Sequence, residues 1–160
     1  MLRNTLAALF LTASASAFAA DTPPANKYVD ATDWPVSEAG MDRFFEAEAR
    51  LNAAFDKVCG DTFCEGDFAN LRPLQLRCSI DATKGTFKQC LWAFAGSHAT
   101  VNPKSGAVQV TAKTFKCKLL LAKDTPAEAF YELTKGDDPL HAKLPMASVS
   151  IYDGLPGCIN

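Results

Sequence analysis

The 160-residue sequence lacks the residue spacings that mark most metal and catalytic sites. Cys59 and Cys64 are too far apart for the C-x2-C pair of a zinc knuckle, and both histidines lie far from any cysteine pair. Ser97 beside His98 is not a catalytic triad, because a triad needs a shaped constellation with an orienting acid. We therefore expect a protein that is not an enzyme, with no catalytic residues, no metal site and no cofactor.

Long apolar runs are missing from the chain beyond residue 20, where no segment approaches the roughly 20 apolar residues that span a bilayer. A short apolar run from Leu6 to Ala13 follows Arg3 and precedes Ala17-Phe18-Ala19. This order is typical of a signal peptide, with cleavage between Ala19 and Ala20. The sequence predicts export to the periplasm or, as an alternative, secretion.

The chain divides into three predicted segments. Residues 1–19 are the signal peptide, and residues 20–36 are a flexible N-terminal segment with Pro23 and Pro24 and few side chains to bury. Residues 37–160 are long enough for a single domain with its own core. No internal repeat or low-complexity stretch interrupts that domain.

Charge is segregated along the sequence. Residues 21–67 carry 11 acidic and 4 basic side chains, residues 68–123 carry 1 and 9, and residues 124–160 carry 6 and 2. One explanation is internal, with acidic helices lying near a basic sheet. The other is a basic sheet face that binds an acidic partner. Nucleic acid is not expected, because the chain is exported, has a net charge of −2 and does not interleave aromatic with basic residues.

A long helix is predicted from residue 38 to residue 58. Ser37 is a suitable N-cap, and Glu38 lies in the first turn, where the helix dipole favours an acid. Gly60 is the expected left-handed C-cap. Apolar side chains recur at helical spacing and form a stripe that should cover a sheet: Met41, Phe44, Leu51, Phe55 and Val58.

Residues 74–121 read as three strands of an antiparallel meander, each with one cysteine, because apolar and polar residues alternate with a period of two. A first turn about Lys84 puts Cys78 opposite Cys90. A second turn, folded between Pro103 and Lys104, puts Cys90 opposite Cys117. Three cysteines would then share one face.

The C-terminal part predicts two further elements. Thr125-Pro126-Ala127-Glu128 is typical of a capping box, so a short helix should run to Gly136 and dock at a sheet edge through Phe130 and Leu133. Residues 146–152 can form a fourth strand. The predicted fold is therefore α+β: a long N-terminal helix packed on a three- to four-stranded antiparallel meander, with a second short helix and disulfide bracing. The predicted core consists of Phe44, Leu51, Phe55, Leu76, Ile80, Trp92, Phe94, Phe115 and Leu119.

Six cysteines in an exported chain favour three disulfides. Cys59–Cys64 follows from proximity, and Cys78–Cys90 follows from cross-strand opposition. Cys117 competes for Cys90 in this register. Cys158 needs a partner, however. The Gly- and Pro-rich segment before it allows the C-terminal end of the chain to return to the third strand, which favours Cys117–Cys158.

Two surfaces are candidate partner-binding sites. The first is the 59–70 loop, with the acids Asp61, Glu65 and Asp67. These acids are either solvated side chains on a turn held by a disulfide or contacts for a partner. A third alternative is that they bind calcium together with Asn70, although their spacing matches no EF-hand. The second surface is the sheet face that carries basic side chains. Its candidate residues are Arg77, Lys116 and Lys118.

Residues 59–68 and 152–158 resemble signature blocks of a family of small exported bacterial proteins, a family that carries no assigned function. In general outline the chain also resembles small periplasmic immunity or inhibitor proteins. This resemblance is of type and not of motif, so it carries over no functional residue.

The favoured interpretation is a periplasmic binding protein, an inhibitor or immunity protein that blocks a toxin or cell-wall hydrolase. The alternatives are an envelope accessory or small-ligand-binding protein and, less favoured, a hydrolase. A hydrolase would assemble its site from carboxylates such as Asp61, Glu65 or Asp153.

Overall fold

The structure is a computed structural model that describes residues 26–144 and 146–159. The predicted signal peptide and residues 20–25 of the predicted flexible segment lie outside these ranges. The described residues form, in chain order, β1 (Tyr28–Asp30), η1 (Ala31–Asp33), α1 (Glu38–Cys59), β2 (Arg72–Asp81), β3 (Thr86–Val101), β4 (Val108–Lys118), β5 (Thr125–Pro126), α2 (Ala127–Thr134), η2 (Tyr152–Gly154) and α3 (Pro156–Ile159).

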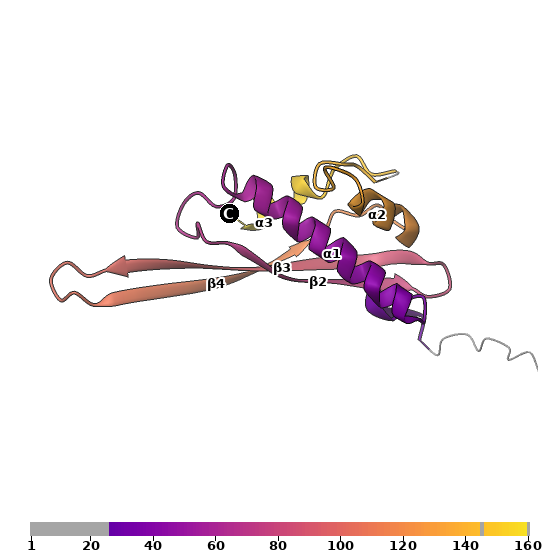
Figure 1. Ribbon diagram of the computed structural model, residues 1–160, viewed down its shortest axis with the longest axis horizontal. Coiled ribbons are helices and arrows are strands. Elements are labelled where there is room, and N and C mark those ends of the chain that lie inside the picture. The colour runs from indigo at the N-terminus through magenta and orange to yellow at the C-terminus, as the bar shows by residue number, and fades with distance from the viewer. Residues whose placement is uncertain (1–25, 145, 160) are drawn as a thin grey trace, which may run out of the picture.

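The fold is α+β, as predicted. The antiparallel sheet has the strand order β1-β2-β3-β4, and β5 pairs with the start of β3. Helix α1 crosses the sheet diagonally (Figure 1). Buried and exposed residues alternate along β2 and much of β3, which shows that one sheet face is packed and the other is open. No helix among the described residues is long and apolar enough to cross a membrane.

Helix α1 begins and packs as its sequence predicts. Ser37 Oγ accepts a hydrogen bond from the Gly40 N–H at 3.3 Å, and the buried stripe includes Phe44, Leu51 and Phe55. The prediction of a left-handed Gly60 is wrong, since its φ is −61° and its ψ is −31°. The chain keeps turning there because the Cys64 N–H donates to Cys59 O at 2.7 Å inside the small disulfide loop.

The register of the first hairpin is confirmed, with Cys78 opposite Cys90. Its turn is tight because Gly85 has a φ of +63° and lies against the Trp34 ring, where a Cβ would come within 2.8 Å of a ring carbon. One extra residue bulges from β3, since Ser79 faces Gln89 while Ile80 faces Phe87.

The register of the second hairpin differs from the prediction by two residues. Trp92, and not Cys90, lies opposite Cys117. Asn102 moves the turn, because its Oδ1 accepts hydrogen bonds from the Lys104 and Ser105 N–H groups while Gly106 adopts a φ of +71°. A slip of two residues leaves every side chain on its predicted face, so the predicted core survives the error.

All three predicted disulfides are present: Cys59–Cys64, Cys78–Cys90 and Cys117–Cys158. All nine predicted core residues are buried, none of them more than 4% exposed. The centre of the core is aromatic, with the Trp92 and Phe94 ring centroids 4.7 Å apart and the Phe55 ring against both. The disulfides are compatible with an extracellular or periplasmic location.

Two predictions for the C-terminal part are wrong. The predicted capping box is absent, because Thr125 pairs with Phe87 in β5 and its hydroxyl donates to Ala122 O. The predicted strand over 146–152 is a turn: Asp153 accepts hydrogen bonds from the Ser150 N–H and hydroxyl, and η2 and α3 follow. A local hydrogen-bonded turn thus prevails over a short apolar alternation.

Residues 28–33 were expected to be part of a flexible segment and instead form β1 and η1. Three residues of β1 pair with β2, and Ala31 is fully buried. So short a strand, with one apolar side chain between Tyr28 and Asp30, offers little periodicity from which to predict it.

Candidate functional site

The exposed side of the sheet, here called the open face, is built from the residues that alternate with the core. Lys118 lies opposite Leu91, and Lys116 lies opposite Ala93, so β4 presents lysines beside the small and apolar residues of β3. Both lysines are exposed, and Leu91 is 39% exposed. The open face consists of Gln75, Arg77, Ser79, Gln89, Leu91, Ala93, Ala95, Thr114, Lys116 and Lys118.

The three basic candidates on the open face are not equivalent. Arg77 Nη1 lies 3.1 Å from Asp30 Oδ2 on β1, so its charge is partly neutralised within the molecule. Lys116 and Lys118 form no ion pair with any described residue. The uncompensated positive charge of this face therefore lies on β4.

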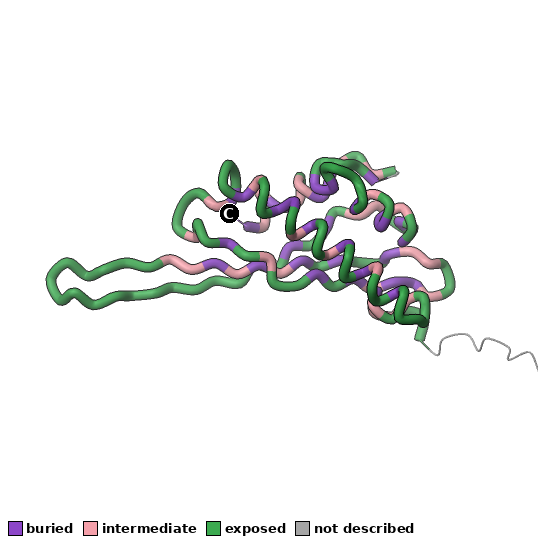
Figure 2. The backbone as a smooth tube through the Cα atoms, viewed as in Figure 1, coloured by how far each residue is buried: buried purple, intermediate pink, exposed green. Residues whose placement is uncertain are grey.

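Beyond the helices, β3 and β4 continue as a projecting hairpin, here called the arm, residues 97–112. Every residue from Ala99 to Thr114 is exposed (Figure 2). The arm extends away from the helical layer (Figure 1). Because β2 pairs with β3 only as far as Ala95, the β3 strand of the arm has no β2 residue paired beside it.

The arm is amphipathic across its two faces. One face of the arm lies in line with the packed face of the sheet, and its side chains are polar: Thr100, Gln109 and Thr111. The face that continues the open face is apolar, and Val101 lies directly opposite Val108. Val101, Val108 and Val110 are 65%, 66% and 65% exposed.

The base of the arm is held in place by the loop that precedes β2. The Asn70 side chain accepts a hydrogen bond from the Ser97 N–H and donates one to its hydroxyl, both at 2.6 Å. Gly96 permits this approach, because a Cβ there would lie 3.0 Å from Phe68 Cβ and 3.1 Å from Leu71 Cδ2. The direction in which the arm projects is therefore fixed by contacts at its base.

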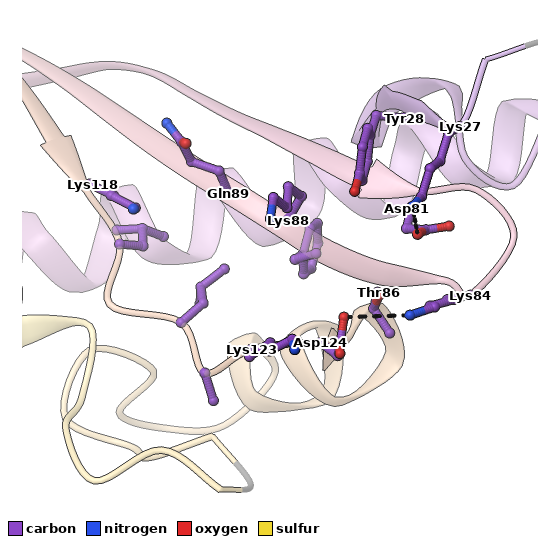
Figure 3. Close-up of a pocket in the computed structure, with 14 residues that line it drawn as sticks. Lys27, Tyr28, Asp81, Lys84, Thr86, Lys88, Gln89, Lys118, Lys123 and Asp124 are labelled. Atoms are coloured by element: carbon purple, nitrogen blue, oxygen red, sulfur yellow. Dashed lines mark ion pairs between the residues drawn. The ribbon is translucent and has the colours of Figure 1, made fainter.

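Beside the open face lies a second feature, here called the lysine hollow, of about 430 Å³. It forms where the chain after β4 leaves the ladder at Lys118 and returns only at Thr125, opposite the bulge of β3. Its charged lining comes from four segments, the approach to β1, the first hairpin, the end of β4 and the chain after β4 (Figure 3): Lys27, Asp81, Lys84, Lys88, Lys118, Lys123 and Asp124.

Both acids of the lysine hollow already have partners. Asp81 Oδ2 lies 3.9 Å from Lys27 Nζ, and Asp124 Oδ1 lies 4.0 Å from Lys84 Nζ (Figure 3). The Thr83 hydroxyl donates to Asp81 at 2.6 Å, and this hydrogen bond holds the pKa of Asp81 below its usual range although burial acts in the opposite direction. Asp81 is therefore an anion at neutral pH.

Comparison of the chain with protein-family models, curated proteins and solved structures found no match.

The acidic candidates of the 59–70 loop lie on the other side of the sheet. Glu65 and Asp67 share a hollow of about 240 Å³ with Lys113, which points to the core side of β4 and lies over the Phe115 ring. Asp61 is exposed outside that hollow. The loop therefore has a basic neighbour within the molecule, in agreement with the internal explanation of charge segregation for this part of the surface.

Other candidates that the sequence left open have structural roles. Asn70, considered as a calcium ligand, holds the arm, and no group of three or more potential metal-binding side chains occurs among the described residues. Asp153 accepts hydrogen bonds from the Ser150 N–H and hydroxyl, and these keep its pKa below the usual range. A general acid needs the opposite shift.

Sequence reasoning located the open face but missed the arm and the lysine hollow. One signal for both was present: no acidic residue occurs between Asp81 and Asp124, whereas seven lysines do. The projection of the arm could not be predicted, because side chains on its two strands alternate between the faces as they do in any strand. The hollow depends on the bulge at Lys88 and on where β4 ends, and neither is encoded in a local motif.

Proposed function

We propose that this protein is an exported, non-enzymatic binding protein whose open face and arm hold an acidic protein partner. The form we favour is an inhibitor or immunity protein that blocks a toxin or cell-wall hydrolase in the periplasm. One observation carries the proposal: a projecting arm continues an uncovered sheet face, and neither contains an acidic side chain.

Charge complementarity defines the chemistry of the partner. Lys116 and Lys118 on the open face and Lys104 at the tip of the arm are exposed and have one sign. Lysines on one face attract an acidic surface and speed association at low ionic strength. The apolar residues between and beyond them supply area from which water is expelled on binding.

The dimensions of the arm favour a concave partner. Five residues per strand at about 3.3 Å each, with the turn, make a ribbon about 22 Å long and about 10 Å wide. Contact with one face covers about 220 Å², far less than the roughly 600 Å² per partner of a small specific interface. A cleft that encloses both faces and both edges covers about 900 Å², within the ordinary range.

The clefts of cell-wall hydrolases have the matching shape and sign. Glycoside hydrolases act on a chain bound in a cleft and use a pair of carboxyl groups that flank the scissile bond. An arm that ends in Lys104 and contains no acid is complementary to such a cleft. A rigid arm also loses little conformational entropy on insertion, and the Asn70–Ser97 hydrogen bonds hold its base in place.

The test is an assay of peptidoglycan hydrolysis. The mature, oxidised protein is titrated into envelope extracts of the producing cells and of competing strains while the release of labelled peptidoglycan is followed. We expect a stoichiometric fall in rate with the wild type and at least a tenfold weaker effect with Lys116→Glu/Lys118→Glu.

The matched control is Lys57→Glu/Lys143→Glu, which makes the same change in net charge at exposed positions outside the open face and arm. It should inhibit like the wild type. Two results would contradict the proposal: no hydrolytic activity slowed at tenfold molar excess, or equal loss in both charge-reversed variants.

A small-ligand-binding role is the second candidate, and the lysine hollow is the specific observation that favours it. A volume of about 430 Å³ lies within the range of small-molecule sites. The two candidates use separable residues, because Lys88 and Lys123 line the hollow without belonging to the open face.

A further inference from the structure

We propose that the lysine hollow is a binding site for an anion that bears phosphate groups, with at least two negative charges. The site adjoins the open face and shares Lys118 and Gln89 with it, so only Lys88 and Lys123, which are not among the open-face residues, are varied to test it. Its central residues are Lys88, Lys118 and Lys123.

The charge balance of the hollow is the first argument. Five lysines and two aspartates line it, which leaves a net charge of +3. The aspartates pair with Lys27 and Lys84, at 3.9 and 4.0 Å, while Lys88, Lys118 and Lys123 form no ion pair with any described residue. The excess positive charge thus lies on three lysines from different segments around one opening (Figure 3).

The convergence of these lysines is built into the backbone. Lys88 is at the bulge of β3, Lys118 is the last residue of β4, and Lys123 lies on the return to β5. Two ladder contacts, Leu91 with Lys118 and Phe87 with Thr125, fix the two ends of the opening. Sheet pairing therefore fixes the backbone positions from which the three lysines line the hollow.

The chemistry of the lining suits a phosphate. All the basic side chains that line the hollow are lysines. Lysines act as point charges with rotatable donors and are common phosphate ligands. Gln89, Thr86 and Tyr28 add neutral polar groups to the same lining.

The anionic Asp81 limits where in the hollow an anionic ligand can lie. Its carboxylate is buried, accepts hydrogen bonds from the Thr83 N–H and hydroxyl, and stays charged beside Lys27. It therefore repels a ligand from that wall of the hollow and leaves the Lys88, Lys118 and Lys123 side as the place for the phosphates.

Inorganic pyrophosphate is the direct probe, titrated into the full mature protein by calorimetry at about 20 mM and about 150 mM salt. We expect saturable one-to-one binding that weakens with salt. Lys88→Gln/Lys123→Gln should weaken it at least about tenfold. Lys57→Gln/Lys143→Gln, with the same loss of charge at exposed positions outside the hollow, should stay within about twofold of the wild type.

Two further measurements keep the outcome unambiguous. Lys88→Arg/Lys123→Arg preserves charge and should retain binding within about threefold, and circular dichroism reports whether each variant folds. The proposal is overturned if the protein shows neither saturable binding of pyrophosphate nor binding to the vesicles. Equal loss of binding in both glutamine variants also overturns it, because net charge and not the hollow would then explain the binding.

Phosphate can arrive on a soluble molecule or on a lipid headgroup, and the same variants distinguish these sources. Co-sedimentation uses vesicles of cardiolipin, whose headgroup bears two phosphates and two negative charges, mixed with phosphatidylcholine, against phosphatidylcholine alone. Pyrophosphate binding without vesicle binding assigns a soluble phosphate. Vesicle binding that Lys88→Gln/Lys123→Gln abolishes assigns a headgroup. Inhibition of peptidoglycan hydrolysis is measured separately, so that failure of either proposal leaves the other standing.

Discussion

Arg77 Nη1 lies 3.1 Å from Asp30 Oδ2, and this ion pair joins β2 to the short edge strand β1. It separates the basic residues of the open face into two kinds. Arg77 is neutralised within the molecule, whereas Lys116 and Lys118 on β4 carry charge that no described residue offsets. The pair is half exposed, so its contribution to stability is small.

The first prediction follows from this difference. Lys116→Glu/Lys118→Glu should slow association with the acidic partner about tenfold at low salt and by less than about threefold at 0.5 M salt, because exposed charges are screened. Arg77→Gln should change the rate by less than about twofold. Stopped-flow association at several salt concentrations measures both, and a larger effect of Arg77→Gln would show that the open face binds through β2 instead.

The second prediction concerns the core. Trp92→Ala should lower the free energy of unfolding by about 3–5 kcal/mol, because Trp92 is fully buried against Phe55 and Phe94. Leu74→Ala, at a position 56% exposed on β2, should cost less than about 1 kcal/mol. Urea unfolding followed by circular dichroism measures both, since the substitution removes a fluorophore. A loss below about 1 kcal/mol for Trp92→Ala would mean that the packed face has been misidentified.

The third prediction compares two disulfides. Loop-closure entropy gives a stabilisation of about 4 kcal/mol for Cys117–Cys158 and about 2 kcal/mol for Cys59–Cys64, since the paired cysteines are 41 and 5 residues apart. Replacing both cysteines of each pair by alanine should show this ratio in urea unfolding. Equal losses would show that the long bridge does not restrict the unfolded chain in the expected way.

The fourth prediction concerns acid stability. The pKa of Asp81 is lowered in the folded protein, chiefly by the Thr83 hydroxyl, so its stabilising contribution is present above the unfolded pKa near 3.8. That contribution is lost as the pH falls through the folded pKa. The difference in unfolding free energy between the wild type and Asp81→Asn should therefore shrink from pH 5 to pH 2. A difference that grows over this interval would contradict the assignment.

The elements that sequence reasoning predicted correctly are those with strong periodicity. The helix from residue 38, the faces of β2 to β4 and the three disulfides follow from spacing and alternation. The register of the second hairpin could not be predicted from alternation, because a shift of two residues leaves the alternation unchanged. Asn102 decides where the turn closes.

The arm and the lysine hollow were harder to predict, because both arise at the positions where strand pairing ends. Asn70 has no partner in its own neighbourhood of the sequence, since Ser97 is 27 residues away. Lys88 and Lys123 converge only because β4 ends early and β5 returns to β3. Local propensity contains none of this information, although the acid-free run of residues 82–123 marks the region in which both features lie.

The central claim is that the arm enters the cleft of a cell-wall hydrolase or toxin, and shortening the arm tests it most directly. Residues 99–110 are replaced by Asn-Gly, which joins His98 to Thr111, two residues that already lie opposite each other. The deleted residues are all exposed, so the free energy of unfolding should fall by less than about 1 kcal/mol.

The measurement is the inhibition of peptidoglycan hydrolysis by this shortened protein. We expect that the shortened protein folds like the wild type and has lost inhibition at least a hundredfold. A shortened protein that folds and inhibits as strongly as the wild type would contradict it.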